Sequence, residues 1–263
     1  MIITTGGKAR SALIQRAKEL GELLGIKYVE RRDRSIENLM AEESKGVIVV
    51  QKERILYYDP EIEGPVFFHP NSAIFRIKRL KRGEEDPFIR NAGLEKGMTL
   101  LDCTLGWASD SIVAQYVVGN QGRVVGIEGS PTIALLTKLG LEVYQDKDPE
   151  IEAAMRNVEV HEGDHFEFLK GLEDNSFDVV YFDPMFEEKI LNSDGIKPLK
   201  HYALYRSITD SLIEEAKRVA ERRVVLKDHW KSDRFTQFGF DVEIRKTSKF
   251  HFGVTVPGTF QEH

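Results

Sequence analysis

The feature of this sequence that most constrains its fold is a regular alternation of apolar and helical segments after residue 98. Five near-continuous apolar segments alternate with segments of helical spacing, and they are 99–103, 123–128, 158–161, 177–183 and 222–228. Such strands are typical of a parallel sheet covered by helices on both faces. Two further strands, 240–246 and 250–256, are too close for a crossover helix and should form an antiparallel hairpin. The pattern predicts a Rossmann-like α/β domain with a mostly parallel, seven-stranded sheet.

The beginning of the sequence shows a second, smaller α/β pattern. Its expected strands are 2–5, 26–29, 47–50 and 55–58, and its expected helices are 8–24 and 35–43. Residues 59–65 hold two prolines and a glycine, which mark a loop. A basic helix should follow at 71–81, and a short one should begin at Pro87. We therefore expect a small N-terminal module over residues 1–68 and a larger domain over residues 69–263.

The charge of the chain is unevenly distributed. The net charge is −6, but residues 1–92 carry 17 Lys and Arg against 14 Asp and Glu. Basic residues cluster in this part, and they include Arg31, Arg32, Arg34, Arg76, Lys78, Arg79, Lys81 and Arg82. Such a cluster is either a solvated helix face or a patch that contacts phosphates, and an acidic protein can bind RNA through one local patch. Under the second interpretation, Arg76, Lys78 and Arg79 bind the substrate.

Composition excludes several classes of protein. No segment approaches the roughly 20 apolar residues that a membrane helix needs, and no apolar signal segment follows Met1. Cys103 is the only cysteine, so no intramolecular disulfide can form and a reducing compartment fits. The seven histidines and this cysteine show no metal-ligand spacing. We expect a cytoplasmic protein without a bound metal.

The first apolar strand ends in an acidic turn that contains Asp102, Thr104 and Gly106. In doubly wound sheets, ligands bind beyond the carboxyl ends of the strands. The turn has one glycine, where a dinucleotide fingerprint needs three, and no phosphate-binding loop is present. A dehydrogenase is therefore excluded, and the acidic residue suits a ligand with a cationic amino group. The alternative is a plain strand-to-helix turn in which Asp102 is a cap.

Acidic residues also follow the second and third apolar strands. Glu128 ends the second strand about twenty residues after the Gly106 turn, where a carboxylate can accept both hydroxyls of a ribose. Asp164 follows the third strand and could accept from an adenine amino group. It could equally cap the next helix, and the two roles are compatible. Three acidic residues at successive strand ends are more specific than any one of them.

The sharpest signal is the segment Asp183-Pro184-Met185-Phe186 at the end of the fourth strand. This turn offers a carboxylate, a backbone carbonyl and an aromatic ring around one small space. Exocyclic amines of nucleobases need acceptors for their N–H groups and a π-face to stack on. The alternative is a proline turn with a buried Phe186. We expect Asp183, Pro184 and Phe186 to be the catalytic residues.

These motifs resemble a known family. The span from Asp102 to Lys189 is similar to the RsmJ-type ribosomal RNA guanine-N2 methyltransferases, which belong to the class I S-adenosylmethionine-dependent enzymes. Their Asp-Pro-Met-Phe motif, with a lysine beyond it, is matched fully. The resemblance implies S-adenosylmethionine as cofactor and Lys189 at the substrate. It also implies that the cofactor pocket is lined by Ser109, Asp110, Glu128, Gly129, Asp164, His165 and Asp183.

The chain also departs from that family. The family's turn reads Asp-Ala-Thr-Ala-Gly-Leu-Gly-Arg-Asp, whereas Ala108 and Ser109 stand here in place of its second glycine and its arginine. The chain is therefore a distant relative, and the modified nucleotide stays open. The N-terminal segment from Thr4 to Ser11, with Val47 to Val50, resembles the Brix/Imp4 module of ribosome-assembly proteins. That resemblance implies an arm that docks RNA.

We therefore interpret the chain as a methyltransferase for an exocyclic amino group of a base in RNA, with ribosomal RNA or a ribosomal particle as partner. A methyltransferase for DNA or for a small amine is a second interpretation, since the Asp-Pro-x-aromatic turn also serves those enzymes. A third is a non-catalytic assembly factor that keeps a cofactor pocket, against which the intact Asp183 turn counts. The oligomeric state and the modified position stay open.

Overall fold

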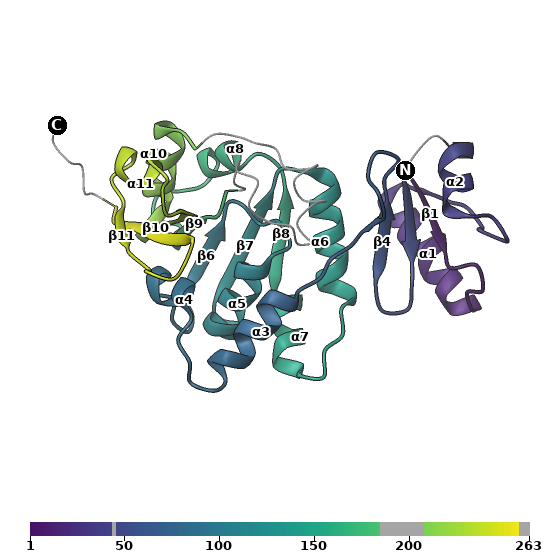
Figure 1. Ribbon diagram of the computed structural model, residues 1–263, viewed down its shortest axis with the longest axis horizontal. Coiled ribbons are helices and arrows are strands. Elements are labelled where there is room, and N and C mark those ends of the chain that lie inside the picture. Colours follow the sequence, from purple (N-terminus) through teal and green to yellow (C-terminus); the bar gives the residue numbers. More distant parts are fainter. Residues whose placement is uncertain (44–45, 185–207, 258–263) are drawn as a thin grey trace. The chain divides into compact units, whose positions relative to one another are not determined.

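The computed structural model describes residues 1–43, 46–184 and 208–257 of the 263-residue chain. The chain divides into two compact units (Figure 1). The first contains Met1–His69 and Lys138–Gln145, and the second contains Pro70–Thr137 and Asp146–His263. Each unit has its own sheet.

The first unit is built on a five-stranded sheet with the order β2-β1-β3-β4-β5. Its elements are β1 (Ile2–Thr5), α1 (Ser11–Leu24), β2 (Lys27–Tyr28), α2 (Ile36–Glu43), β3 (Val47–Val50), β4 (Ile55–Tyr58) and β5 (Pro65–Val66). β1 is parallel to β2 and β3, because a helix separates each pair of consecutive strands. The short turn after β3 makes β4 antiparallel to it. The strand β5 begins at Pro65, where we had expected a loop, and it pairs with β4.

Close packing fixes α1 against this sheet. A Cβ atom on Gly21 would lie 2.7 Å from the Ile26 carbonyl oxygen and 3.0 Å from the Ile3 side chain, so glycine lets the helix approach β1 and the chain that leads into β2 this closely. Ile2 is the next residue on the strand and points to the opposite face, where it packs with Ile36 and Leu39. The alternation along β1 therefore buries both faces of the sheet.

The second unit contains the larger sheet. Its helices and strands are α3 (Asn71–Leu80), α4 (Pro87–Ala92), β6 (Thr99–Asp102), α5 (Ser109–Val118), η1 (Gly119–Gln121), β7 (Arg123–Glu128), α6 (Pro131–Val143), α7 (Pro149–Arg156), β8 (Val158–Glu162), α8 (His165–Lys170), β9 (Phe177–Phe182), α10 (Asp210–Val219), β10 (Ala220–His229), α11 (Arg234–Gln237), β11 (Asp241–Glu243) and β12 (Phe250–Thr255). Helix α6 runs from this unit into the residues that belong to the first.

The predicted topology of this sheet is confirmed. The strand order is β11-β12-β10-β9-β6-β7-β8, and β6 to β10 are parallel to one another. β12 is antiparallel to both β10 and β11, which gives the expected C-terminal hairpin. Helix α7 was not foreseen. It begins after Asp148, whose side chain accepts the Glu150 N–H, and Pro149 stands at its first position.

Alternating side chains bury both faces of this sheet. On β6, Leu101 belongs to an apolar cluster with residues of α8, α10 and α11, whereas its neighbour Leu100 packs with residues of α4 and α5. On β9, Phe182 likewise belongs to the first of these clusters, and its neighbour Tyr181 belongs to the second. Each of these four side chains is essentially inaccessible to solvent. Burial of one such side chain stabilises the fold by roughly 1.5–3 kcal/mol.

The order of the strands indicates at which edge of the sheet a ligand would bind. β7 and β8 lie on one side of β6, and β9 and β10 lie on the other, so the chain reverses direction across the sheet at β6. The carboxyl ends of all five parallel strands meet at the same edge, where ligands bind in such sheets. Within the described part of the chain, no helix is both long and apolar enough to cross a bilayer.

Candidate active site

Asp102 is the last residue of β6 and is almost completely buried. Its Oδ1 accepts the Thr104 N–H at 3.0 Å, and its Oδ2 accepts the Ser111 hydroxyl at 2.7 Å. Burial raises the pKa of Asp102 to about 7, although these two hydrogen bonds oppose the rise. Both donors are neutral, so a cation placed at this carboxyl would be stabilised strongly.

The turn after β6 has a backbone that few side chains tolerate. Gly106 has a φ of 51°, and a Cβ atom added to it would meet no atom within 4 Å. Ala108 has a φ of 57°, in the left-handed region, which costs roughly 1–2 kcal/mol for a residue with a Cβ. This conformation explains why the RsmJ-type turn has a glycine at the matching position. Ser109 follows as the first residue of α5.

Glu128 ends β7 and faces the same turn. Its Oε2 accepts the Gly106 N–H at 2.9 Å, and its Oε1 accepts the Ser130 N–H at 2.8 Å. Burial raises the pKa of Glu128, and backbone donors, including Gly129, oppose that rise. The fold thus joins the two motifs that the spacing in the sequence had paired. Each carboxylate oxygen keeps a second lone pair that could accept from a ligand hydroxyl.

Asp164 and His165 lie at the start of α8. The Asp164 Oδ1 accepts the Glu167 N–H at 2.9 Å, so the capping role that we considered is confirmed. Its contact with an adenine stays a prediction. The His165 ring meets Phe182 edge-on at a centroid distance of 6.3 Å. Burial lowers the pKa of His165, which favours a neutral imidazole at this edge of the sheet.

Asp183 and Pro184 follow β9 and lie beside the β6 turn. The Asp183 N–H donates to the Thr104 hydroxyl at 2.6 Å, which ties the two strand ends together. The Asp183 Oδ2 lies 2.6 Å from the Lys227 ammonium nitrogen at the end of β10. The predicted residues Phe186 and Lys189 lie outside the described residues.

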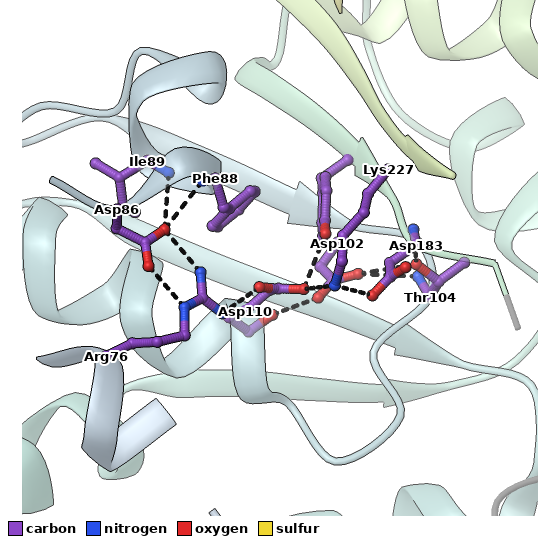
Figure 2. Close-up of polar contacts among 11 residues, drawn as sticks. Arg76, Asp86, Phe88, Ile89, Asp102, Thr104, Asp110, Asp183 and Lys227 are labelled. Atoms are coloured by element: carbon purple, nitrogen blue, oxygen red, sulfur yellow. Dashed lines mark hydrogen bonds and ion pairs between the residues drawn. The ribbon is translucent and has the colours of Figure 1, made fainter. Parts of the chain in front are cut away.

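A chain of charged side chains extends from Asp183 (Figure 2). The Lys227 Nζ also lies 3.2 Å from the Asp110 Oδ2, which accepts the Tyr181 hydroxyl at 2.8 Å. The other oxygen of Asp110 accepts from Arg76. Two carboxylates and two cations therefore alternate through the interior, from the end of β9 to α3.

The far end of this chain is anchored by Asp86. The Arg76 guanidinium binds both oxygens of Asp86, at 2.7 and 2.8 Å. Asp86 in turn accepts the N–H groups of Phe88 and Ile89 and so caps α4. Both partners are largely buried, with exposed side-chain fractions of 18% for Arg76 and 6% for Asp86.

Comparison with known proteins identifies the family to which the chain belongs. A family model described as "putative SAM-dependent methyltransferase" matches residues 34–252, most of the chain. The chain belongs to this family. The methyltransferase is 47% identical to the uncharacterized protein YpiP of Bacillus subtilis (strain 168) over 253 residues, which cover 96% of this chain and 98% of that protein.

More distant relatives carry a named activity. The ribosomal RNA small subunit methyltransferase J of Halorhodospira halophila is 28% identical over 219 residues, covering 78% of this methyltransferase and 76% of that protein. The enzyme of the same name from Actinobacillus succinogenes is 31% identical over 133 residues, about half of each chain (49% and 50%). The solved SAM-dependent methyltransferase NGO1261 from Neisseria gonorrhoeae aligns over 100% of both chains with a TM-score of 0.62 and 18% identity. That structure supports the Rossmann-like fold.

The residues at the ligand edge fit S-adenosylmethionine, the cofactor of the family. Asp102 is a buried acid with neutral donors, which suits the amino group of the cofactor. Glu128 offers carboxylate lone pairs, which suit ribose hydroxyls. The open space in front of Gly106 admits a ligand close to the backbone. The described residues of the methyltransferase therefore offer acceptors that suit the polar groups of this cofactor.

Charge pairing sets the protonation of the cluster behind Asp183. Burial alone would raise the pKa of Asp110, but Lys227 and Arg76 outweigh it and hold that pKa well below its usual range. Burial would lower the pKa of Lys227, but Asp110 and Asp183 raise it above its ordinary value. For Asp183 burial dominates and raises the pKa to about 6, against the effect of Lys227. All members are therefore ionised at neutral pH.

The structure places two predicted residues differently from our expectation. Arg76 does not lie on an exposed basic face, because it is buried between Asp86 and Asp110. Asp110, expected at the cofactor, has its carboxylate occupied by three donors. The other predicted basic residues of α3 are more accessible. Lys78 is exposed, and Arg79 is paired with Glu84 at 2.6 Å near the surface.

Sequence reasoning missed Lys227 altogether. It lies two residues from the end of β10, a strand whose preceding residues Val224, Val225 and Leu226 are completely buried. A lysine that directly follows such residues is unusual, since buried lysines are almost always paired. That pattern was a usable signal, but it could not name Asp110 or Asp183 as the partners.

Proposed function

We propose that this methyltransferase transfers a methyl group to an exocyclic amino group of a base in RNA, with ribosomal RNA as the first candidate. One observation carries the proposal. The Asp183-Pro184 turn directly follows β9, and a hydrogen bond from the Asp183 N–H to the Thr104 hydroxyl joins it to the β6 turn. This places a carboxylate and a backbone carbonyl at the edge of the sheet where the cofactor residues gather. The distant relatives named as ribosomal RNA methyltransferases support the choice of RNA.

The cofactor is assigned to the ends of β6, β7 and β8. Asp102 receives its amino group, Glu128 accepts its ribose hydroxyls, and Asp164 accepts from its adenine. Further residues line the same pocket, and they are Thr104, Gly106, Ser109, Gly129 and His165. When bound, S-adenosylmethionine supplies a methyl group on a positively charged sulfur, and that sulfur leaves with the electron pair of the broken carbon–sulfur bond.

The acceptor groups prepare the target amine. The amino group of a nucleobase is a poor nucleophile because its lone pair is delocalised into the ring. Asp183 and the Pro184 carbonyl accept its two N–H bonds, which localises the lone pair on nitrogen and stabilises the positive charge that develops there. The lone pair forms the new N–C bond, and one proton then leaves the nitrogen for water. Phe186 stacks on the base.

The first unit is proposed to dock the RNA. The carboxyl ends of β1, β2 and β3 lie at one edge of its sheet, because these strands are parallel. Basic residues lie in the loops that leave this edge, and they are Lys8, Arg10, Arg31, Arg32, Arg34, Lys52 and Arg54. Such a cluster fits the phosphate backbone of RNA. The proposal keeps the expectation of a cytoplasmic protein.

The test is single-turnover transfer of labelled methyl to ribosomal RNA from a strain that lacks the gene, followed by mass spectrometry of the nucleosides. We expect an N-methylated guanine, adenine or cytosine. Asp183→Ala should lower the rate about 10²–10³-fold while cofactor affinity is kept, since one electrostatic partner is lost. Asp241→Asn, at an exposed position on β11, is the matched control and should keep the wild-type rate.

The outcomes separate the competing functions. Methyl on a ring carbon or a ribose would refute the amino-group assignment. Transfer to DNA or to a small amine, but not to RNA, would establish the second interpretation. Cofactor binding without transfer to any acceptor would indicate a non-catalytic assembly factor. A near-normal rate for Asp183→Ala would remove Asp183 from the mechanism.

A further inference from the structure

The ammonium group of Lys227 lies between the buried carboxylate of Asp110 and the partly exposed carboxylate of Asp183. Its Nζ is 2.6 Å from Asp183 and 3.2 Å from Asp110. The Lys227 side chain is 24% exposed, and those of Asp183 and Asp110 are 25% and 10% exposed. The contact is therefore shielded from water on the Asp110 side and open on the side of the acceptor turn.

The position of this ammonium group is determined by several elements. Asp110, on α5, accepts from Lys227, from the Tyr181 hydroxyl of β9 and from Arg76 of α3. Arg76 is itself held by both oxygens of Asp86. Each link is a charge-assisted hydrogen bond, the strongest type in proteins. A flexible lysine side chain is thus fixed next to the residue that we assign to the substrate amine.

We propose that Lys227 is a positioning residue of the acceptor site, which holds the Asp183 carboxylate ionised and fixed so that its remaining lone pairs receive the target amine. The identity of that amine rests on the proposed function, but the coupling of Lys227 to Asp183 does not.

The charges around Asp183 show why a cation is needed there. The negative charges of Asp110 on α5, Asp102 on β6 and Asp228 on β10 favour the protonation of Asp183, as its burial does. Lys227 is the cation in direct contact with it among the described residues. Arg76 acts at longer range, through Asp110. A protonated Asp183 would present a donor where the substrate amine needs an acceptor.

The contacts of Asp183 with described residues also leave lone pairs that a substrate amine could use. Lys227 contacts only Oδ2 of Asp183, and an ionised carboxylate has about four lone-pair sites. The Asp183 N–H is already bound to Thr104, which keeps the backbone of the turn in place. Among the described residues, Lys227 and Thr104 therefore hold the carboxylate and the backbone N–H of Asp183 and leave further lone pairs of the carboxylate for a ligand.

The test measures the ionisation of Asp183 without any substrate. The carboxyl carbons of aspartate are labelled with ¹³C, and the Asp183 signal is assigned by its loss in Asp183→Asn. In Lys227→Met the pKa of Asp183 should rise by about 1–3 units, the usual effect of a neighbouring opposite charge. Lys227→Arg should keep it close to the wild-type value, because the cation is retained.

A second variant moves the titration in the opposite direction. Asp110→Asn removes a neighbouring negative charge, so the pKa of Asp183 should fall. An unchanged Asp183 titration in folded Lys227→Met would overturn the proposal. If Lys227→Met does not fold, as judged by its thermal transition, Lys227→Gln takes its place: a higher pKa of Asp183 supports the coupling, and an unchanged or lower one refutes it.

Methyl transfer gives the second readout. On RNA, Lys227→Met should be about 2- to 90-fold slower than the wild type at pH 7, according to whether the pKa of Asp183 rises by about 1 or about 3 units, and the rate should recover towards pH 9 as Asp183 ionises. An equal loss at every pH would indicate a merely structural ion pair and would refute the positioning role. If the wild-type protein methylates no RNA, the proposed function fails, while the carboxyl titration still decides the role of Lys227.

Discussion

Cofactor affinity should depend on pH through Asp102. This carboxyl is buried, its pKa is raised to about 7, and its described hydrogen bonds come from neutral donors. A cationic amino group placed beside it would require the ionised form. Binding of S-adenosylhomocysteine should therefore release a proton and become tighter as the pH rises.

The magnitude follows from the ionised fraction. With a pKa of about 7, roughly one molecule in ten is ionised at pH 6, so the apparent affinity should be about tenfold weaker at pH 6 than above pH 8. That difference corresponds to about 1.4 kcal/mol. At pH 7 about half of the molecules are ionised, and binding should release about half a proton.

The raised pKa of Asp102 also predicts how the stability of the unliganded protein depends on pH. The pKa of Asp102 in the folded state lies above its ordinary value of 3.8. Its contribution is therefore fully present below pH 3.8 and is lost as the pH rises through about 7. Between pH 5 and pH 8 this loss should amount to about 3 kcal/mol. Asp102→Asn should abolish it, so the variant gains stability relative to the wild type as the pH increases.

Calorimetry with S-adenosylhomocysteine at pH 6, 7 and 8, in buffers of different ionisation enthalpy, measures both affinity and proton release. Urea unfolding at pH 5 and 8 measures the stability difference. Asp178→Asn is the control, because Asp178 lies near the start of β9 and binds Thr99 at the opposite edge of the sheet. Affinity that is flat from pH 6 to 8, without proton release, would refute the assignment of Asp102 to the cofactor amino group.

Three further perturbations test other parts of the molecule. Glu128→Ala should weaken the binding of S-adenosylhomocysteine by about 1–3 kcal/mol, because ribose hydroxyls lose a charged acceptor; an unchanged affinity in calorimetry removes Glu128 from the site. Arg76→Met should lower the free energy of unfolding by about 3–5 kcal/mol in urea titrations, because two buried carboxylates lose their partner, and a loss below 1 kcal/mol would contradict this. Lys78→Ala on the same helix should cost under about 0.5 kcal/mol. The double variant Lys78→Ala, Arg79→Ala should bind RNA more weakly and with a smaller dependence on salt concentration, while its cofactor affinity is unchanged. If RNA affinity and its salt dependence both stay at the wild-type level, these residues form only a solvated face.

Much of the fold was predictable because it depends on local patterns. Near-continuous apolar segments separated by helical ones specify a parallel sheet, and the short gap before Phe250 specifies the antiparallel hairpin at its edge. Of the two shortest strands, β2 was predicted within 26–29 and β5 was not. Strand β5 has two residues, and it exists through its pairing with β4.

The sequence by itself also predicted which acidic side chains meet at the candidate site. Asp102, Glu128 and Asp183 each stand at the end of an apolar strand, and the carboxyl ends of parallel strands meet at one edge. Position along a strand is a local property, so these residues could be selected without knowledge of the fold. The proposed roles of Phe186 and Lys189 stay predictions of the sequence alone.

Only the tertiary structure decided which charges neutralise one another. Lys227 is 117 residues from Asp110 and 44 from Asp183, and Arg76 is 34 residues from Asp110. The cost of burying a charge makes a partner necessary, but neither periodicity nor spacing encodes which distant residue supplies it. Arg76 therefore looked like part of an RNA-binding face in the sequence, whereas packing of α3 against α5 buries it between Asp86 and Asp110.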